Sequence, residues 1–521
     1  MQRFPFFYAV FALILLFAVP CRADQLGGVE DAKALDTDDI EKVVDAPIKV
    51  AQQASKGVVW GKSNKTKEPE KVPAEKPLPQ KTTVQRPVSS TADRLNKESE
   101  LSGEKVLLAS SRKRGAADLV ETLLEVSGDV NEVDAEMKEA TNKMEVVAGF
   151  RYEERLSQFS AAGSSLVSVR KYNLAKAKMK IGDVIKTPEL DNELQTIVAS
   201  LDGSKVALFS PNGSLRGEQL LLIEDLPGNT LTLDRLLPNK EVAVGDTWKI
   251  SDSVLRSFLS VDAVTESNVE AVLTAVADKM AMVEVVGDVS GVYLGAATEM
   301  NIRAKYQFDM ERQRINWLGL LIEEDRSVGH VGPGMNVVAR LQVKVSPLDA
   351  PQSLTDDIVE GIDAKPNVQT LQLKYGGGKG PWRFSHDRSW YVFQDDVQAT
   401  ILRKLSKGEL IAQCNIADMG KVDLKTMTTL DKFQKELSNG LGKNFGKVAA
   451  AEEKQNKAGY KVFTVLIDGT VDELNLRWIY NLLTDKDGQQ AVVVFVVEEE
   501  NLEAFGDADE VLLDTFRLGK K

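Results

Sequence analysis

Closely spaced turn signals divide the stretch from Lys205 to Ile250, and they constrain the fold more than any other feature of this sequence. Pro211-Asn212-Gly213, Pro227-Gly228-Asn229 and Pro238-Asn239-Lys240 combine residues that fix or reverse the direction of the backbone. The apolar runs between these turns are short, so each can form a strand, one arm of a hairpin or a single helical turn. We therefore expect an antiparallel arrangement, and the stretch contains no pattern that indicates catalysis.

The length and composition of the chain indicate several hydrophobic cores. At 521 residues it exceeds the roughly 100–200 residues of a typical domain. Hydrophobic residues make up 43% of the sequence and charged residues 27%, as in soluble globular proteins. The net charge of −13 argues against nucleic acid as a partner, because a basic binding surface is missing.

Residues 1–23 have the organisation of an export signal. Arg3 supplies a positive charge, Phe6 to Val19 form an apolar run, and Cys21-Arg22-Ala23 precede an expected cleavage site. The apolar run spans about 14 residues, whereas a helix that crosses a bilayer needs about 20. We expect an exported protein, periplasmic or extracellular, whose mature chain has no stable transmembrane segment. Retention of the signal as an anchor and lipidation of Cys21 are the alternatives.

Residues 24–115 are expected to form a mostly disordered tether. From Gly61 to Thr91 the sequence combines prolines with lysines and glutamates and contains no aromatic residue. Such a segment buries too little apolar surface to offset the entropy that folding would remove. Its lysines could contact an acidic polymer, but the interspersed Glu68, Glu70 and Glu75 favour a solvated spacer.

Residues 116–346 are expected to form a domain of long strands. Met144–Leu156 and Ser165–Asp183 contain stretches of period-two alternation between apolar and polar residues. A short helix is expected at Ser253–Leu259, where Ser251 and Asp252 can cap the first amides. Because helices do not alternate with the strands, the pattern predicts an antiparallel β-rich domain, either a sandwich or a curved sheet. Further strands are expected at Thr196–Leu201, Lys205–Ser210, Val269–Ala277, Ala281–Val289, Ala297–Asp309, Asn316–Glu324 and Asn336–Val345.

One motif in this domain has a counterpart in known sequences. The residues PNKEVAVGDTWKI, with Gly245-Asp246-Thr247-Trp248 ahead of a strand, resemble a motif of an uncharacterised β-rich family of bacterial secreted proteins with lipoprotein-like members. The resemblance covers about a dozen residues. It implies a curved sheet able to hold an apolar ligand or a partner, and it implies no chemistry.

Residues 347–370 are polar and contain three prolines, so they are expected to link this domain to a second one at residues 371–521. In the second domain the helix Leu430–Leu441 carries an apolar stripe, and Thr428 and Asp431 are placed to form a capping box. Trp478 and Tyr480 lie on the apolar face of one strand. Strands are expected at Leu371–Tyr375, Trp390–Phe393, Thr400–Lys404, Glu409–Ile416, Lys461–Ile467, Glu473–Leu483 and Ala491–Val497, and a last helix at Leu502–Phe516.

This order of a strand meander with two helices across it resembles the PsbP-like and Mog1-like α/β/α sandwich family. The resemblance covers about Leu371 to Leu518 and rests on the Trp390–Phe393 strand, AQCNI, LDKFQKEL, NLRWIYNLL and VVVFVVE. It implies an α+β fold. Members of that family are assembly factors and adaptor-like proteins without a shared catalytic residue set, so the resemblance implies no reaction.

The two histidines of the chain limit its catalytic chemistry. His386, near Asp387, Asp395 and Asp396, is the better candidate for the base of a hydrolase. The simpler interpretation is a turn in which Asp387 and Arg388 pair or cap the backbone.

Other polar clusters also have simpler interpretations. Glu323-Glu324-Asp325 and His330 could surround a divalent ion, but neighbours on a strand point to opposite faces, so a charged sheet edge is the better interpretation. Cys414 lies in the apolar run LIAQCNIA, which is typical of a buried strand. If Cys21 leaves with the signal, Cys414 has no partner for a disulfide.

The sequence contains no HExxH, GxSxG, dinucleotide-binding or paired-cysteine metal motif, so we assign no catalytic, cofactor-binding or metal-ligating residue. We expect an exported, non-enzymatic binding or scaffold protein of a bacterial cell envelope that recognises an envelope protein or an apolar ligand. The alternatives are a carrier that holds a lipid or other apolar molecule in the β-rich domain and a hydrolase that uses His386.

Overall fold

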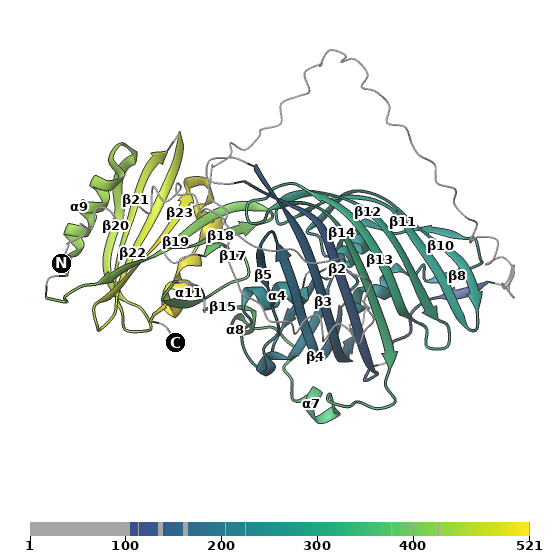
Figure 1. Ribbon diagram of the computed structural model, residues 1–521. Coiled ribbons are helices and arrows are strands. Elements are labelled where there is room, and N and C mark those ends of the chain that lie inside the picture. The colour runs from purple at the N-terminus through teal and green to yellow at the C-terminus, as the bar shows by residue number, and fades with distance from the viewer. Residues whose placement is uncertain are drawn as a thin grey trace, which may run out of the picture.

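The computed structural model describes residues 105–519, except residues 113, 134–138, 160–164, 204, 225, 377, 379, 396–398, 426 and 472. Two large open sheets lie side by side in this part of the chain (Figure 1). The expected export signal and the expected tether up to residue 104 lie outside the described residues. No helix in the described part combines the length and the apolar character needed to cross a membrane.

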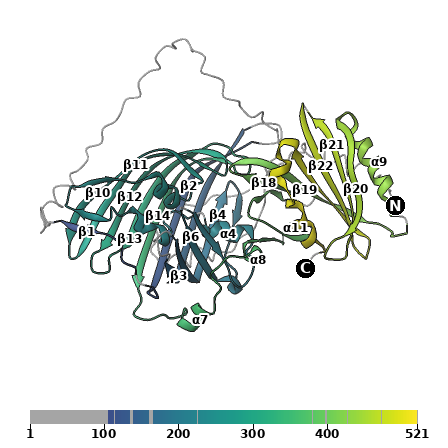
Figure 2. The ribbon, with the colours of Figure 1, turned by 180° about the vertical axis from the view of Figure 1, so that it is seen from behind.

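The first sheet contains 12 strands in the order β7-β6-β4-β3-β2-β14-β13-β12-β11-β10-β9, with β5 paired to β4. Two runs of hairpins meet where β14 pairs antiparallel with β2. This arrangement confirms an antiparallel β-rich domain, and the open sheet is curved rather than folded into a sandwich (Figures 1 and 2). The strands are β2 (Ala117–Val133), β3 (Glu139–Phe159), β4 (Ser165–Ile181), β5 (Val184–Lys186), β6 (Thr196–Asp202), β7 (Lys205–Phe209), β9 (Thr247–Lys249), β10 (Ala263–Ala277), β11 (Met280–Tyr293), β12 (Ala296–Asp309), β13 (Arg314–Arg326) and β14 (Gly334–Pro347).

The stretch from Lys205 to Ile250 forms more helix than we expected. After β7 it contains α4 (Gly217–Glu224), α5 (Thr230–Leu233) and a 3₁₀ turn (Asp234–Leu236), and only then β8 (Lys240–Val242) and β9. A short apolar run suits a buried helix as well as a strand, and here one face of a wide sheet has to be covered. The expectation that each run forms a strand, a hairpin arm or at most a single helical turn was therefore wrong at α4, which has eight residues.

These helices fill the concave side of the first sheet. Apolar side chains of α4, α5 and α6 (Asp252–Leu259) belong to the same buried cluster as the inward-facing residues of the strands. The indole Nε1 of Trp248 donates a hydrogen bond to the carbonyl oxygen of Leu236 at 3.1 Å. Helix α6 lies where it was expected, but the Ser251 side chain makes no capping bond and its hydroxyl instead lies 3.2 Å from that of Ser253.

Regular structure begins earlier than residue 116. Strand β1 (Val106–Leu108) pairs antiparallel with β8, and Leu108 is fully buried in the core of the first domain. The last residues of the expected tether are therefore part of the fold.

The second sheet contains seven strands in the order β17-β18-β19-β23-β22-β21-β20. A small sheet, β15-β16-β24, lies beside it. The strands are β15 (Leu373–Tyr375), β16 (Trp382–His386), β17 (Trp390–Asp395), β18 (Ala399–Ser406), β19 (Glu409–Lys421), β20 (Phe445–Gln455), β21 (Lys461–Val471), β22 (Leu474–Thr484), β23 (Gln489–Glu498) and β24 (Arg517–Leu518).

Separate apolar clusters cover the two faces of the second sheet. Helix α9 (Leu430–Leu441) packs Phe433, Leu437 and Leu441 on one face, and α10 (Leu502–Phe505) and α11 (Ala508–Thr515) contribute to the other. The first helix has the expected bounds, although its capping side chain is Thr429 rather than Thr428. The expected last helix is interrupted at Gly506, which has a φ of 54°.

We predict that Trp478→Ala strongly destabilises the second domain. Trp478 is 7% exposed and belongs to the cluster under α9, and loss of a buried aromatic side chain typically costs about 3–5 kcal/mol. Val392→Ala, at a side chain that is 41% exposed, provides the control. Thermal unfolding should show a lower transition for the second domain only in the tryptophan variant. An unchanged transition would mean that this face is a binding surface rather than a core.

Candidate functional site

His386 lies on β16 and is only 3% exposed. Its Nδ1 atom lies 2.8 Å from the backbone carbonyl oxygen of Asp387, whose carboxylate accepts hydrogen bonds from Ser389 and lies 3.4 Å from Lys404 Nζ. Asp395 accepts a hydrogen bond from a tyrosine hydroxyl, and Asp396 lies outside the described residues. Burial lowers the pKa of His386, which favours the neutral imidazole. The described aspartates therefore do not orient this histidine as they would in a hydrolase.

The other predicted polar cluster is dispersed. Glu324 accepts hydrogen bonds from Arg326, whereas Glu323 lies 3.8 Å from Arg303 and Asp325 accepts from an asparagine on β14. Among the described residues, no group of three or more potential metal-ligating side chains is placed to hold an ion. Cys414 is fully buried, and burial raises the pKa of its thiol, which favours the protonated form.

The concave side of β3 and β4 carries a buried charged network that sequence reasoning missed. The carboxylate of Glu154 accepts hydrogen bonds from Arg170 Nε at 2.9 Å, Ser168 Oγ at 2.9 Å and Thr230 Oγ1 at 2.8 Å. The side chains of Arg170 and Glu154 are 2% and 3% exposed. Arg170 also donates to the side-chain oxygen of Asn229, the cap of α5, at 2.7 Å. The network therefore fixes α5 to the sheet.

A second group of charges continues this network toward the start of β2 and β13. Asp234 accepts hydrogen bonds from Arg112 Nε and Ser110 Oγ, each at 2.7 Å, and Arg314 Nη1 donates to Asp118 at 2.6 Å. The Nε and Nη2 atoms of Arg314 are buried without a hydrogen-bond partner. Burial raises the pKa of Asp118 although the guanidinium of Arg314 opposes the shift. These paired charges hold segments together and leave no free nucleophile or base.

The convex side of β3 binds the connection between the domains. This connection, residues 348–371, is called the strap here and contains α7 (Asp356–Glu360) and α8 (Val368–Leu371). The carboxylate of Glu153 accepts three backbone N–H bonds, from Gln352 at 3.0 Å, Ser353 at 2.6 Å and Leu354 at 3.2 Å. Glu153 itself is 4% exposed. The strap is therefore bound to the first domain and does not run free.

Further contacts bind the strap along its length. Arg155, two residues after Glu153 on β3, donates to the carbonyl oxygen of Leu354 at 2.7 Å and to the carboxylate of Asp356 at 2.8 Å. Farther along, an apolar cluster joins the strap to the outer face of β4, β6 and β7. Its members are Ile362, Ala364 and Leu371 from the strap and Val167, Val198 and Phe209 from the strands.

Arg388 connects the second domain to the strap and to the first sheet. Its Nε donates to the carbonyl oxygen of Leu371 at 3.0 Å, and its Nη2 donates to the carbonyl oxygen of Leu208 on β7 at 2.7 Å. Its Nη1 lies 3.4 Å from the carboxylate of Glu224 at the end of α4. One guanidinium thus binds three segments, and one of its hydrogen bonds goes to a backbone carbonyl oxygen of the edge strand of the first sheet.

Backbone contacts and two hairpin tips complete the junction between the domains. Leu373 on β15 belongs to the core of the first domain, and the amide of Lys374 donates to the carbonyl oxygen of Leu215 at 2.8 Å. The hairpin tip between β11 and β12, at Gly295, touches the tip between β18 and β19, at Gly408. A Cβ atom added at Gly295 would lie only 2.1 Å from the carbonyl oxygen of Gly408. Arg403 also donates to a carbonyl oxygen of the first domain, and burial lowers the pKa of its guanidinium to about 10. We call these contacts, together with the strap and Arg388, the junction.

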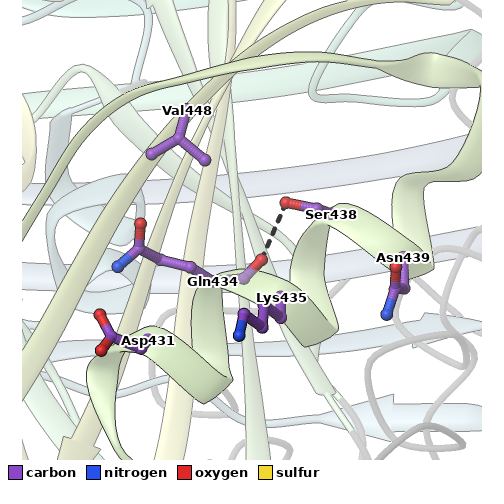
Figure 3. Close-up of a pocket in the computed structure, with 6 residues that line it drawn as sticks. All are labelled: Asp431, Gln434, Lys435, Ser438, Asn439 and Val448. Atoms are coloured by element: carbon purple, nitrogen blue, oxygen red, sulfur yellow. Dashed lines mark hydrogen bonds between the residues drawn. The ribbon is translucent and has the colours of Figure 1, made fainter.

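An open groove of about 500 Å³ lies between α9 and β20. Figure 3 shows the side chains of Asp431, Lys435 and Asn439 along α9, with Val448 of β20 across from them. The Ser438 hydroxyl donates to the carbonyl oxygen of Gln434 at 2.9 Å, which is an internal bond of the helix. Mixed charge and neutral amides make the groove polar, and its two charged side chains, Asp431 and Lys435, are both exposed.

Comparison with known proteins assigns the chain to no family, because no family model and no curated protein matches it. A Pseudomonas aeruginosa protein of unknown function, PA94, is 12% identical over 26% of this chain and 88% of its own length, with a TM-score of 0.19. Lipovitellin is 9% identical over 50% of this chain and 27% of its own length, with a TM-score of 0.26. OccK2 from P. aeruginosa is 8% identical over 74% of this chain and 100% of its own, with a TM-score of 0.11. Similarity at this level carries no argument about fold or function.

We predict that Glu154→Gln destabilises the first domain by about 3–5 kcal/mol near pH 7, because Arg170 would remain buried without its anionic partner. Burial opposes the charge of Glu154, but Arg170, Arg112 and two hydroxyl groups outweigh it and lower the pKa of Glu154. Because the pKa of Glu154 is lower in the folded state than in the unfolded state, its ionised carboxylate contributes its full stabilisation above pH ~5. This stabilisation is lost as the pH falls through the folded-state pKa. Wild-type stability should therefore fall with acidity below pH ~5 more steeply than that of the variant.

Urea unfolding at a series of pH values measures both effects, with Glu266→Gln at an exposed position of β10 as the control. If the free energy of unfolding changes equally with pH in the wild type and in Glu154→Gln, the network does not control the sensitivity of the fold to acid.

We also predict that Glu153→Gln loosens the strap while both sheets remain folded. The neutral amide keeps one acceptor oxygen where the carboxylate has two, and hydrogen bonds to a charged group are worth about 1.5–3 kcal/mol. Limited proteolysis should cut residues 349–366 faster than in the wild type. Unchanged cleavage would mean that Arg155 and the apolar cluster suffice to hold the strap.

Proposed function

We propose that this protein is a non-enzymatic scaffold of a bacterial cell envelope, which presents its two sheet domains to a partner protein in a fixed relative position. The observation that carries the proposal is the junction, in which partly buried polar contacts bind the strap and Arg388 to both domains. A freely jointed pair of domains would need only a solvated linker. Fixing two domains is useful where one partner contacts both.

The proposed location rests on residues 1–23, whose pattern predicts export. The tether that follows would separate the folded part from whatever the N-terminus approaches. A fusion of residues 1–30 to a reporter should be exported and trimmed near Ala23. Retention of the fusion in the cytoplasm would remove the basis for an envelope role.

The two alternatives receive less support from the geometry. A carrier needs room for its ligand, and the concave side of the first sheet is filled by α4, α5 and α6. A hydrolase that uses His386 needs an accessible base, and this imidazole is buried against a backbone carbonyl. Native mass spectrometry of the full chain distinguishes the carrier from the scaffold, because a lipid that co-purifies with the chain would favour the carrier.

We predict that Arg388→Ala releases the fixed arrangement of the two domains. The guanidinium bonds to Leu371, Leu208 and Glu224 would all be lost, whereas Arg383→Ala at an exposed position of β16 removes the same charge without touching the junction. Spin labels at Gln342→Cys and Lys435→Cys, both exposed, report the distance between the domains, and the buried Cys414 should not be labelled.

The wild type and Arg383→Ala should give one narrow distance distribution, and Arg388→Ala a broad one. A photo-crosslinker at the same two positions in cells then tests function. The scaffold hypothesis expects one partner protein to be reached from both domains and to be reached less often in Arg388→Ala. Different partners at the two positions, or equal crosslinking in both variants, would overturn it.

A further inference from the structure

A hollow of about 510 Å³ on the first domain brings together three segments that are distant in sequence. It is lined by Gly203 from the turn between β6 and β7, by Arg235 and Asn239 from the segment that follows α5, and by Ser253 and Val254 from the start of α6. The lining therefore contains one cation, an amide and a hydroxyl, and it contains no carboxylate.

Arg235 is partly buried in this hollow, and no carboxylate within the described part of the chain forms an ion pair with it. The neighbouring Asp234 cannot serve, because its oxygens already accept bonds from Ser110, Arg112 and the amide of Ile315. Burial alone lowers the pKa of Arg235, with no neighbouring charge among the causes. The guanidinium remains partly exposed to water, so an anion from solution can reach it and pair with it.

The two neutral groups can add donors beside the guanidinium. The side-chain amide of Asn239 donates one hydrogen to the carbonyl oxygen of Leu237 at 3.3 Å, which leaves its second hydrogen available. Asn239 adopts a φ of 52° and lines the same hollow as the arginine. Within the described part of the chain, the hydroxyl of Ser253 has one hydrogen-bond contact, with the hydroxyl of Ser251, and it can rotate toward a stronger acceptor.

We propose that the hollow at Arg235 binds a phosphate group. A planar guanidinium pairs with two oxygens of a phosphate at once. The donors of Asn239 and Ser253 can bond to the remaining lone pairs of these oxygens, or to the third free oxygen of inorganic phosphate or a phosphate monoester. The phosphate group belongs either to a small soluble phosphate compound or to the headgroup of a phospholipid. The site depends on the lone arginine in the hollow and is independent of the scaffold function.

Inorganic phosphate is the first probe, titrated into the full chain by isothermal calorimetry against sodium chloride of equal ionic strength. Arg235→Gln removes the cation and should weaken binding about ten- to a hundredfold. Arg256→Gln removes the same charge from an exposed position on α6 and should bind like the wild type. Asn239→Asp introduces a negative charge into the hollow and should also abolish binding, which protects the conclusion if one variant folds poorly.

Vesicles of phosphatidylglycerol, compared with vesicles of a neutral sugar lipid without phosphate, form the second arm. Arg235-dependent binding to the phosphate-bearing vesicles would assign the site to a lipid headgroup, and saturable binding of inorganic phosphate without vesicle binding would assign it to a soluble compound. The proposal fails if the wild type binds neither probe, or if Arg235→Gln and Arg256→Gln bind phosphate equally well.

Discussion

The structure depends most on one short segment of β3, Tyr152-Glu153-Glu154-Arg155, in which all four side chains are buried. Successive residues on a strand point to opposite faces, so Tyr152 and Glu154 face the concave core while Glu153 and Arg155 face outward. Glu154 fixes α5 inside the curved sheet, and Glu153 and Arg155 fix the strap outside it. Burying ionised groups is expensive unless each is paired. The pairing here joins distant parts of the chain to a single strand. Because the strap leads to the second domain, the strand that packs in the core of the first domain also helps to set the position of the second.

The curved sheet needs its helices for a related reason, which is the burial of its apolar face. A single sheet with one apolar face must cover that face, and in the described part of the chain only the short two-stranded sheet β1-β8 packs in the same core. Helices α4, α5 and α6 supply the cover, with Trp248 and Tyr306 both placing polar atoms against the carbonyl of Leu236. Because the charged network holds α5, the cover is specific in position rather than a loose apolar layer.

The sequence predicted the parts of the fold that depend on local pattern. Helix Leu430–Leu441 was placed correctly, because its apolar stripe is a local signal, although its cap is Thr429 rather than Thr428. The strand expected at Val269–Ala277 begins instead at Ala263, since pairing with β11 extends it through polar residues that carry no apolar signal. β20 was missed for the same reason, as its alanines and charges do not read as a strand. The buried charges of β3 could not be predicted, because a charged residue on a strand normally faces water and only tertiary contacts show otherwise. The signal that was present is five consecutive large polar or amphipathic residues, Arg151 to Arg155, inside an otherwise alternating strand.

The junction has a consequence for how the two domains share stability. Their cores are largely separate, and yet Leu373 of the second domain packs in the first core and Arg388 binds the edge strand β7. The unpaired edge of a sheet invites association with other strands. Here the guanidinium occupies one carbonyl of that edge, and the strap covers the outer face of the same strands. Docking of the second domain therefore covers part of the β7 edge of the first sheet. The contacts that fix the relative position of the two domains thus also reduce the backbone that this edge exposes to other strands.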